Sequence, residues 1–169
     1  MTVAQGALES PSRRALFRGR RTATAPLRPP WALAEDEFVS CCTRCDDCIG
    51  ACPEGIVLRA DGGFPAVDFQ RGECTFCEAC VEACPSGALV REGPPWTIRA
   101  RVDDRCLALN GVHCQACRDA CPTQAIRFPL RPGVPGPVVD DPTCTGCGAC
   151  VAPCPVDALS VCAAEGVRA

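Results

Sequence analysis

The sequence predicts an α+β fold in which short hairpins, cysteine-rich loops and single helical turns repeat along its 169 residues. Three observations support this prediction. Cysteines recur in four similar runs, each run ends in a Cys-Pro pair, and a short apolar segment follows each pair. An apolar segment, a Gly/Pro-rich turn and a second extended stretch together favour a hairpin. The four apolar segments span residues 56–58, 88–90, 125–128 and 158–161.

Three of the runs have the spacing Cys-x2-Cys-x2-Cys-x3-Cys-Pro, which is the bacterial ferredoxin signature for 4Fe–4S clusters. Two-residue gaps let three thiolates curl around one cluster, whereas the fourth cysteine lies about one helical turn further on and points elsewhere. The following proline has a fixed φ and no N–H, so it helps to end that turn. We therefore predict cluster ligands at Cys42, Cys45, Cys48 and Cys52, at Cys74, Cys77, Cys80 and Cys84, and at Cys144, Cys147, Cys150 and Cys154.

The remaining run is irregular, because seven residues separate its first two cysteines. We expect it to bind a fourth cluster, with the alternative that it is a degenerate loop or binds metal poorly. Its predicted ligands are Cys106, Cys114, Cys117 and Cys121. Cys41 directly precedes Cys42 and breaks the two-residue spacing to Cys45, so it is expected to be a bystander.

In ferredoxins with two clusters, the last cysteine of one run often serves the cluster of the other run. The first run can pair with the second and the third with the fourth, or the runs can be nested, and the sequence leaves both arrangements open. The domain prediction follows the adjacent pairing. It comprises a basic, flexible arm over 1–34, a ferredoxin-like unit over 35–101 (motifs at about 35–62 and 65–94), and a second unit over 102–169 (an irregular motif at about 102–131 and a regular one at about 135–164).

Composition indicates that bound metal holds this fold together. The chain has no tyrosine, two tryptophans and six phenylalanines, but 15 glycines and 17 prolines. Such an inventory builds little apolar core, so cluster binding would also supply folding free energy. The net charge is −3, and residues 1–30 hold six arginines and one acid, which leaves the rest acidic. Nucleic acid is therefore not an expected partner.

The segment Ser12-Arg13-Arg14 looks like the start of a twin-arginine export signal, but the residues after it are polar, charged and broken by proline. An export signal needs an apolar stretch of about 7–15 residues at that place. No stretch approaches the roughly 20 apolar residues of a membrane-spanning helix. We therefore expect a cytoplasmic protein without a membrane span.

Several motifs together resemble the NapF family, the ferredoxin-type accessory proteins of the periplasmic nitrate reductase system. They are Ser12-Arg13-Arg14 with Arg18-Gly19-Arg20, Arg28-Pro29-Pro30-Trp31, Cys42-Thr43-Arg44-Cys45, and the irregular run at Cys106-Leu107-Ala108. No nucleophile–base pair, phosphate-binding loop or substrate acid/base pair is apparent, so we do not expect the protein to be an enzyme by itself. The resemblance implies binding to the unexported precursor of the molybdenum-containing catalytic subunit, help in its maturation, and handling of its iron–sulfur cluster. The alternative is a polyferredoxin that carries electrons between redox partners.

Overall fold

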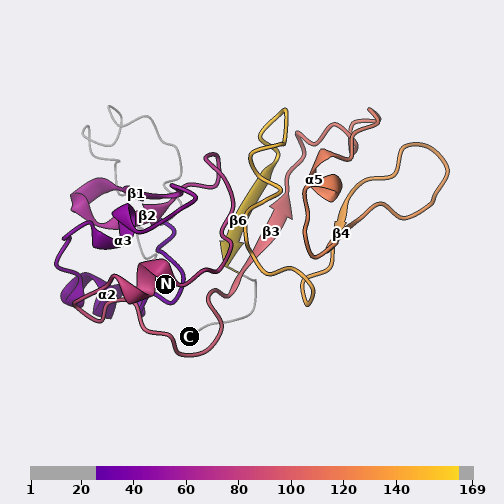
Figure 1. Cartoon of the computed structure of the whole chain (residues 1–169). Coiled ribbons are helices and arrows are strands. Elements are labelled where there is room, and N and C mark those ends of the chain that lie inside the picture. The colour runs from indigo at the N-terminus through magenta and orange to yellow at the C-terminus, as the bar shows by residue number, and fades with distance from the viewer. Residues whose placement is uncertain (1–25, 164–169) are drawn as a thin grey trace, which may run out of the picture.

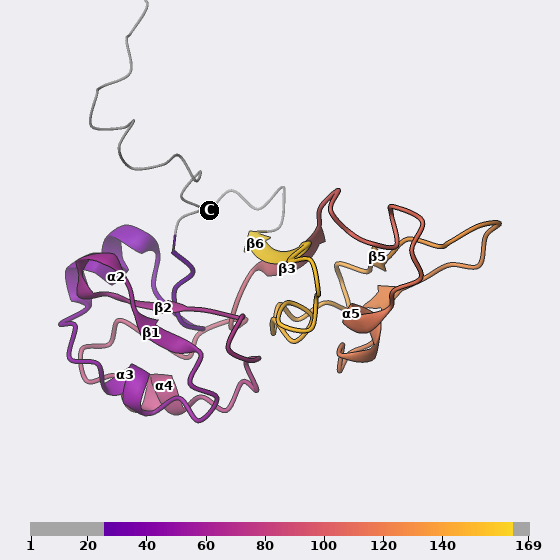
Figure 2. The ribbon, with the colours of Figure 1, turned by 90° about the horizontal axis from the view of Figure 1, so that it is seen from above.

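The computed structural model describes residues 26–163, which form two small α+β bodies in succession along the chain (Figure 1). The first body contains α2 (Glu35–Cys41), α3 (Asp47–Gly50), β1 (Val57–Arg59), the 3-10 helix η1 (Asp61–Gly63), β2 (Pro65–Val67) and α4 (Ala79–Glu82). The second contains β3 (Ile98–Val102), α5 (Ala116–Asp119), β4 (Ile126–Arg127), β5 (Val138–Val139) and β6 (Leu159–Ala163). Figure 2 shows the two bodies side by side, seen from above.

Each body has an inner antiparallel hairpin that follows its first cysteine run. In the first body β1 pairs with β2, with Val57 opposite Val67. In the second body β4 pairs with β5, with Ile126 opposite Val139. Gly62 connects β1 to β2 in the left-handed region, at a φ of 74°, which glycine adopts without steric cost. These two hairpins confirm the prediction for the first and third runs.

The prediction of a hairpin after the second run is wrong. Leu89 instead forms a bridge with Ala32, upstream of the first run, and the N–H of Leu33 donates to the carbonyl of Ala88 at 3.1 Å. Pro94 and Pro95 have no N–H to contribute to a ladder, and the chain crosses there into the second body.

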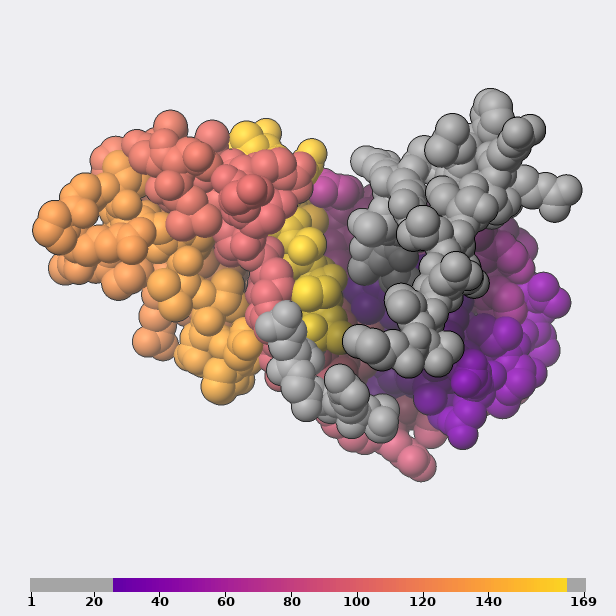
Figure 3. Space-filling model, turned by 180° about the vertical axis from the view of Figure 1, so that it is seen from behind, coloured from indigo at the N-terminus to yellow at the C-terminus, as the bar shows by residue number. Residues whose placement is uncertain are grey.

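The strand beyond this crossing, β3, closes the second body by pairing with β6. Ile98 lies opposite Ala163, and Val102 opposite Leu159. The space-filling view shows β6, in yellow, between the two halves of the molecule (Figure 3). By its pairing, β3 belongs with the second body, although all of its residues except Val102 lie before the boundary at 101/102 that the sequence suggested.

The flexible arm was expected to extend to residue 34, but residues 26–34 pack onto the first body. The N–H of Val67 donates to the carbonyl of Leu27 at 2.7 Å. Arg28 forms an ion pair with Glu35 at 2.6 Å, and its guanidinium carbon lies 5.0 Å from the centre of the Phe38 ring. The contact between Leu27 and Val67 joins segments far apart in the sequence, so no periodic pattern in the segment reveals it. The remainder of the expected arm, 1–25, lies outside the described residues.

Helix α2 was not predicted. Its first turn carries Glu35, Asp36 and Glu37, which interact favourably with the positive end of the helix dipole, and Phe38 is fully buried beneath it. None of the helices among residues 26–163 is long and apolar enough to cross a membrane.

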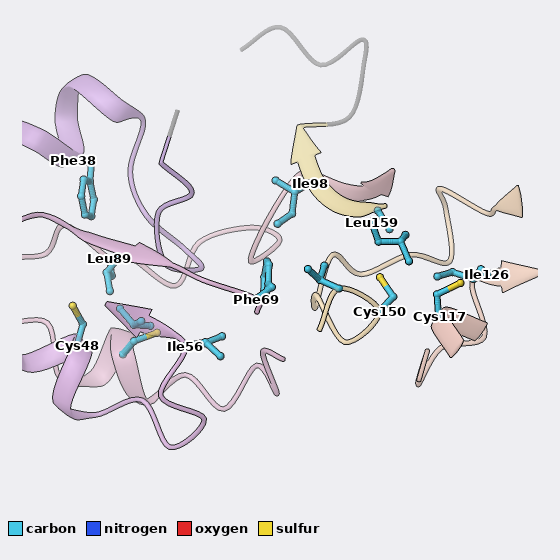
Figure 4. Close-up of a cluster of buried hydrophobic side chains, with 14 of the residues drawn as sticks. Phe38, Cys48, Ile56, Phe69, Leu89, Ile98, Cys117, Ile126, Cys150 and Leu159 are labelled. Atoms are coloured by element: carbon cyan, nitrogen blue, oxygen red, sulfur yellow. The ribbon is translucent and has the colours of Figure 1, made fainter. Parts of the chain in front are cut away.

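The apolar core runs continuously from the first body into the second (Figure 4). Its large side chains are few, with Phe38, Ile56 and Ile126 each at most 2% exposed. The third cysteine of every run is also buried in this core, at 7–8% exposure, namely Cys48, Cys80, Cys117 and Cys150. The core is thus built around the cysteines, in agreement with the scarcity of large apolar residues in the sequence.

Candidate iron–sulfur sites

The three regular runs share one backbone conformation around their second cysteine. A residue with left-handed φ precedes this cysteine, and another follows it. The pairs are Arg44 (60°) and Asp46 (70°), Phe76 (55°) and Glu78 (66°), and Gly146 (74°) and Gly148 (81°). Left-handed residues curl the chain sharply, and non-glycine residues rarely adopt this conformation. The three regular runs therefore form the same kind of loop, which turns the thiols of each run toward one centre.

A single helical turn follows the second cysteine in the first three runs. Helices α3, α4 and α5 each have four residues, and each carries the third cysteine of its run at its second position. This position is buried in all three helices. In the first two runs the fourth cysteine, Cys52 or Cys84, follows the turn and lines the cavity of the other run, as the spacing predicts.

Site A is a small cavity in the first body, lined by three thiols of the first run and one of the second. Its cysteines are Cys42, Cys45, Cys48 and Cys84. Phe38 and Leu89 supply apolar walls. Burial, followed by the nearby charge of Cys84, raises the pKa of Cys48 to about 11.

Site B is a second small cavity in the first body, and the reciprocal set of thiols lines it. Its cysteines are Cys74, Cys77, Cys80 and Cys52. The first and second runs therefore exchange their fourth cysteines. Phe76 also lines the cavity, and its backbone N–H donates to the sulfur of Cys74 at 3.4 Å.

Site C is a small cavity in the second body that gathers three thiols of the irregular run and one of the last run. Its cysteines are Cys106, Cys114, Cys117 and Cys154. The inserted residues form hydrogen-bonded turns rather than an open loop. The side-chain amide of Asn110 donates to the carbonyls of Asp104 and Cys106 at 2.7 and 2.9 Å. The long spacing thus still brings Cys106 to the site.

Site D consists of the first three cysteines of the last run. Burial, followed by the neighbouring Cys147 and Cys144, raises the pKa of Cys150 to about 12. Like these three cysteines, Cys121 of the irregular run lines none of the cavities at sites A, B and C. Its sulfur accepts a hydrogen bond from the N–H of Ala125 at 3.3 Å.

The donor set fits 4Fe–4S clusters. Sites A, B and C each present four thiols around a cavity, and a cubane takes one thiolate on each of its four iron atoms. Among residues 26–163, no three Cys, His, Asp or Glu side chains converge closely enough to hold a single metal ion. Backbone N–H groups that donate to sulfur, such as that of Ala158 to Cys154 at 3.2 Å, suit thiolate ligands.

Burial raises the pKa of the Cys74, Cys80 and Cys117 thiols to about 11 as well. These thiols are therefore neutral at pH 7 in the metal-free protein. Only the thiolate form of cysteine binds metal, so loading of the sites must release protons.

Two cysteines that belong to none of the four predicted ligand sets, and the single histidine, also lie outside the cavities at sites A, B and C. Cys41 is exposed at the end of α2, and Cys162 lies opposite Arg99 in the β3–β6 ladder. His113 is exposed, although it directly precedes Cys114. Spacing alone did not decide whether adjacent or nested runs exchange their fourth cysteines. At sites A, B and C, each thiol set combines three cysteines of one run with the fourth cysteine of an adjacent run.

These bodies define the class of protein to which the chain belongs. A family model described as a 4Fe–4S dicluster domain matches residues 40–89, and a second with the same description matches residues 112–158. The chain is therefore an iron–sulfur protein of the ferredoxin type, with two regions that match domains for two clusters each.

Similarity to curated proteins identifies the family within this class. The chain is 43% identical to the ferredoxin-type protein NapF of Escherichia coli K12 over 152 residues, which cover 88% of this chain and 93% of that protein. It is 43% identical to NapF of Haemophilus influenzae over 137 residues, which cover 80% and 78%. The chain belongs to the NapF family, as its sequence motifs suggested.

A shorter similarity links the chain to another ferredoxin-type protein. It is 47% identical to the methylamine utilization ferredoxin-type protein MauM of Methylobacillus flagellatus over 53 residues, or 31% of this chain and 23% of that protein.

Proposed function

We propose that the protein binds four 4Fe–4S clusters, two in each body, with the fourth cysteine of each run serving the partner cluster. The thiol sets around sites A, B and C support this assignment, and site D follows by the same exchange. The proposed ligands are Cys42, Cys45, Cys48 and Cys84 at site A, Cys52, Cys74, Cys77 and Cys80 at site B, Cys106, Cys114, Cys117 and Cys154 at site C, and Cys121, Cys144, Cys147 and Cys150 at site D.

When bound, such clusters supply one-electron redox chemistry. The chain's own contribution is to bury one thiol of each set, to donate backbone N–H groups to sulfur, and to surround the sites with apolar side chains. Burial, hydrogen bonds and charge are the properties by which a protein sets cluster potentials.

Exchange of the fourth cysteines can be tested with a reciprocal pair of variants. Cys52→Ser should disturb the signal of site B, and Cys84→Ser that of site A, because each residue lines the cavity of the other run. Electron paramagnetic resonance of the reduced variants distinguishes the two signals. The exchange is refuted if Cys52→Ser changes the signal that Cys42→Ser changes, and leaves intact the signal that Cys74→Ser changes.

We further propose that the protein is a cytoplasmic accessory factor for the periplasmic nitrate reductase. In this role it binds the unexported precursor of the molybdenum-containing catalytic subunit and assists its maturation, including the handling of its iron–sulfur cluster. Membership of the NapF family is the observation that carries this proposal. The clusters take part in the maturation, and the chain is not itself an enzyme.

The second candidate is an electron carrier that exchanges electrons with a redox partner. It is favoured by the two dicluster regions in one chain and by the direct backbone contact between the two bodies at Cys74 and Cys147. A carrier recognises a mature enzyme, whereas an accessory factor recognises the precursor.

Binding measurements separate the two candidates. The loaded protein should capture the unexported precursor and bind the mature catalytic subunit at least about tenfold more weakly, a difference of about 1.4 kcal/mol. Preference for the mature subunit, together with rapid electron exchange, would establish the carrier instead. Metal-free protein serves as the control for dependence on the clusters.

A further inference from the structure

The contact between the two bodies joins the second cysteine run to the last one. The backbone N–H of Cys74 donates a hydrogen bond to the carbonyl oxygen of Cys147, at 2.8 Å. Cys74 lines site B, and Cys147 belongs to the thiol set of site D. A single hydrogen bond therefore links ligand residues proposed for clusters in different bodies.

Side-chain packing fixes this contact. Gly148, the residue after Cys147, lies so close to Phe69 that a Cβ atom there would overlap the aromatic ring. Phe69 is 5% exposed, so its ring has little room to move. Figure 4 shows Phe69 between the part of the core around Ile56 and the part around Cys150. The side-chain amide of Gln70 also donates to Asp157 across the same contact, at 3.4 Å.

The chain that connects the bodies is attached to the first of them. The N–H of Trp31 donates to the carbonyl of Pro95 at 2.9 Å, and the indole N–H of Trp96 donates to the carbonyl of Arg28 at 3.2 Å. The Trp96 ring packs edge-on against Phe69, with 5.6 Å between ring centroids. The connection is therefore anchored rather than free to swing.

We propose that the four sites form one series in the order A, B, D, C, and that the Cys74–Cys147 contact carries electrons between the bodies. This inference rests on the proposed cluster content. With clusters bound, Cys74 would help to hold the cluster of site B and Cys147 that of site D, and transfer of one electron between them would oxidise the first cluster and reduce the second, with no proton or leaving group.

The other two steps of the series lie within the bodies. Helices α3 and α4 contact each other and carry Cys48 of site A and Cys80 of site B. In the second body, Cys117 of site C lies within electrostatic reach of Cys150 of site D, and Figure 4 shows the two side chains as neighbours. Sites A and C are thus the ends of the series, and B and D are its middle.

Two double variants of the full chain test this order. Cys48→Ser with Cys117→Ser leaves sites B and D, whereas Cys80→Ser with Cys150→Ser leaves sites A and C. Each should retain roughly eight iron atoms per chain, because a cluster holds four. In the fully reduced proteins, electron paramagnetic resonance should show spin–spin broadening for the B and D pair and its loss for the A and C pair.

Equal broadening in the two double variants, or stronger broadening for A and C, would overturn the series. An iron content far from eight atoms per chain in either double variant would instead contradict the ligand assignment of the proposed function. The series is then tested by a second measurement, which uses protein with all of its motif cysteines intact.

The second measurement uses the glycine at the contact. Gly148→Ala should separate the bodies, so small-angle X-ray scattering of the loaded protein should show a larger radius of gyration and the spin–spin broadening should weaken. Gly133→Ala is the matched control, because Gly133 has nearly the same φ (82° against 81°) but nothing within 4 Å of an added Cβ. If Gly148→Ala scatters like Gly133→Ala and the wild type, the fixed contact and the series built on it are refuted.

Discussion

The hydroxyl of Ser86 lies 3.6 Å from the sulfur of Cys84, two residues after it in the chain. Thr123 has the same relationship to Cys121, also at 3.6 Å. Burial works to raise the pKa of both thiols, but hydrogen bonds from the hydroxyl and from backbone N–H groups outweigh it and leave the pKa below its usual value. The fourth cysteines at sites B and C, Cys52 and Cys154, are followed at the same spacing by Glu54 and Val156 and lack such a hydroxyl.

The first prediction concerns this hydroxyl. A hydrogen bond to a ligand sulfur stabilises the more negative, reduced state of a cluster, so Ser86→Ala should lower the reduction potential of site A. The shift should be roughly a few tens of millivolts, since hydrogen bonds to charged groups contribute about 1.5–3 kcal/mol and only the difference between the redox states counts. A potentiometric titration followed by electron paramagnetic resonance measures it.

Ser40→Ala provides the control for this substitution, because the Ser40 hydroxyl donates to the carbonyl of Glu37 on the exposed helix α2. An unchanged potential in Ser86→Ala would show that the Ser86 hydroxyl does not donate to the ligand sulfur.

The second prediction compares two nearby cysteines of the first run. Cys48 is 8% exposed and lines site A, whereas Cys41 is exposed at the end of α2. Cys48→Ser should remove about one cluster, or roughly four iron atoms per chain, and Cys41→Ser should remove none. Iron and acid-labile sulfide analysis of anaerobically purified protein gives both values. Equal losses in the two variants would mean that the register of the first run is misassigned.

The third prediction concerns the irregular run. The turns between Cys106 and Cys114 are held by the Asn110 side chain and by the N–H of Val112, which donates to the carbonyl of Leu107 at 2.9 Å. Cys106→Ser should therefore remove the cluster of site C, and Asn110→Ala should weaken its retention without removing it. Exposure to a chelator, followed by the rate of iron loss, measures both effects.

Leu109→Ala is a useful control, because Leu109 is half exposed in the same turns and its side chain does not line site C. Full iron content in Cys106→Ser would mean that the irregular run is a loop without a cluster.

The sequence was most informative where the chemistry of a residue depends on local spacing. The cysteine runs predicted short turns, and the inner hairpins at Val57 and Ile126 followed from apolar segments and turn residues. The choice between adjacent and nested runs was left open, because it depends on which thiols meet in space. The adjacent exchange is visible only where Cys84 reaches the first run and Cys52 the second.

Long-range pairing explains the two features that the sequence misplaced. β3 and β6 are separated by more than fifty residues, and neither strand carries a local signal for the other. The segment around Arg28 looked like part of an arm because its stabilising partners, among them Pro65 and Trp96, are also distant in sequence. Spacing therefore predicts the loops, whereas the closing strands depend on contacts that a single sequence does not encode locally.

The fourth prediction separates the two parts of the N-terminal region. Residues 1–25 carry five arginines, and residues 26–34 pack onto the first body through Leu27, Arg28 and Trp31. Deletion of 1–25 should leave the iron content unchanged and weaken binding to the reductase precursor, since arginines bind acidic surfaces through bidentate hydrogen bonds. Deletion of 1–33 should also destabilise the first body, because it removes the partner of Leu89.

Affinity for the precursor, measured at two salt concentrations, decides the role of the arginines. Screening weakens exposed charge interactions at high salt, so the difference between full-length protein and the 1–25 deletion should shrink there. Equal affinities at low salt would end the docking hypothesis.

Arg28→Ala then tests the packed segment alone, because it removes the ion pair to Glu35 and the contact with the Phe38 ring but keeps all of residues 1–25. It should lower the thermal stability of the first body and leave the salt dependence of binding unchanged.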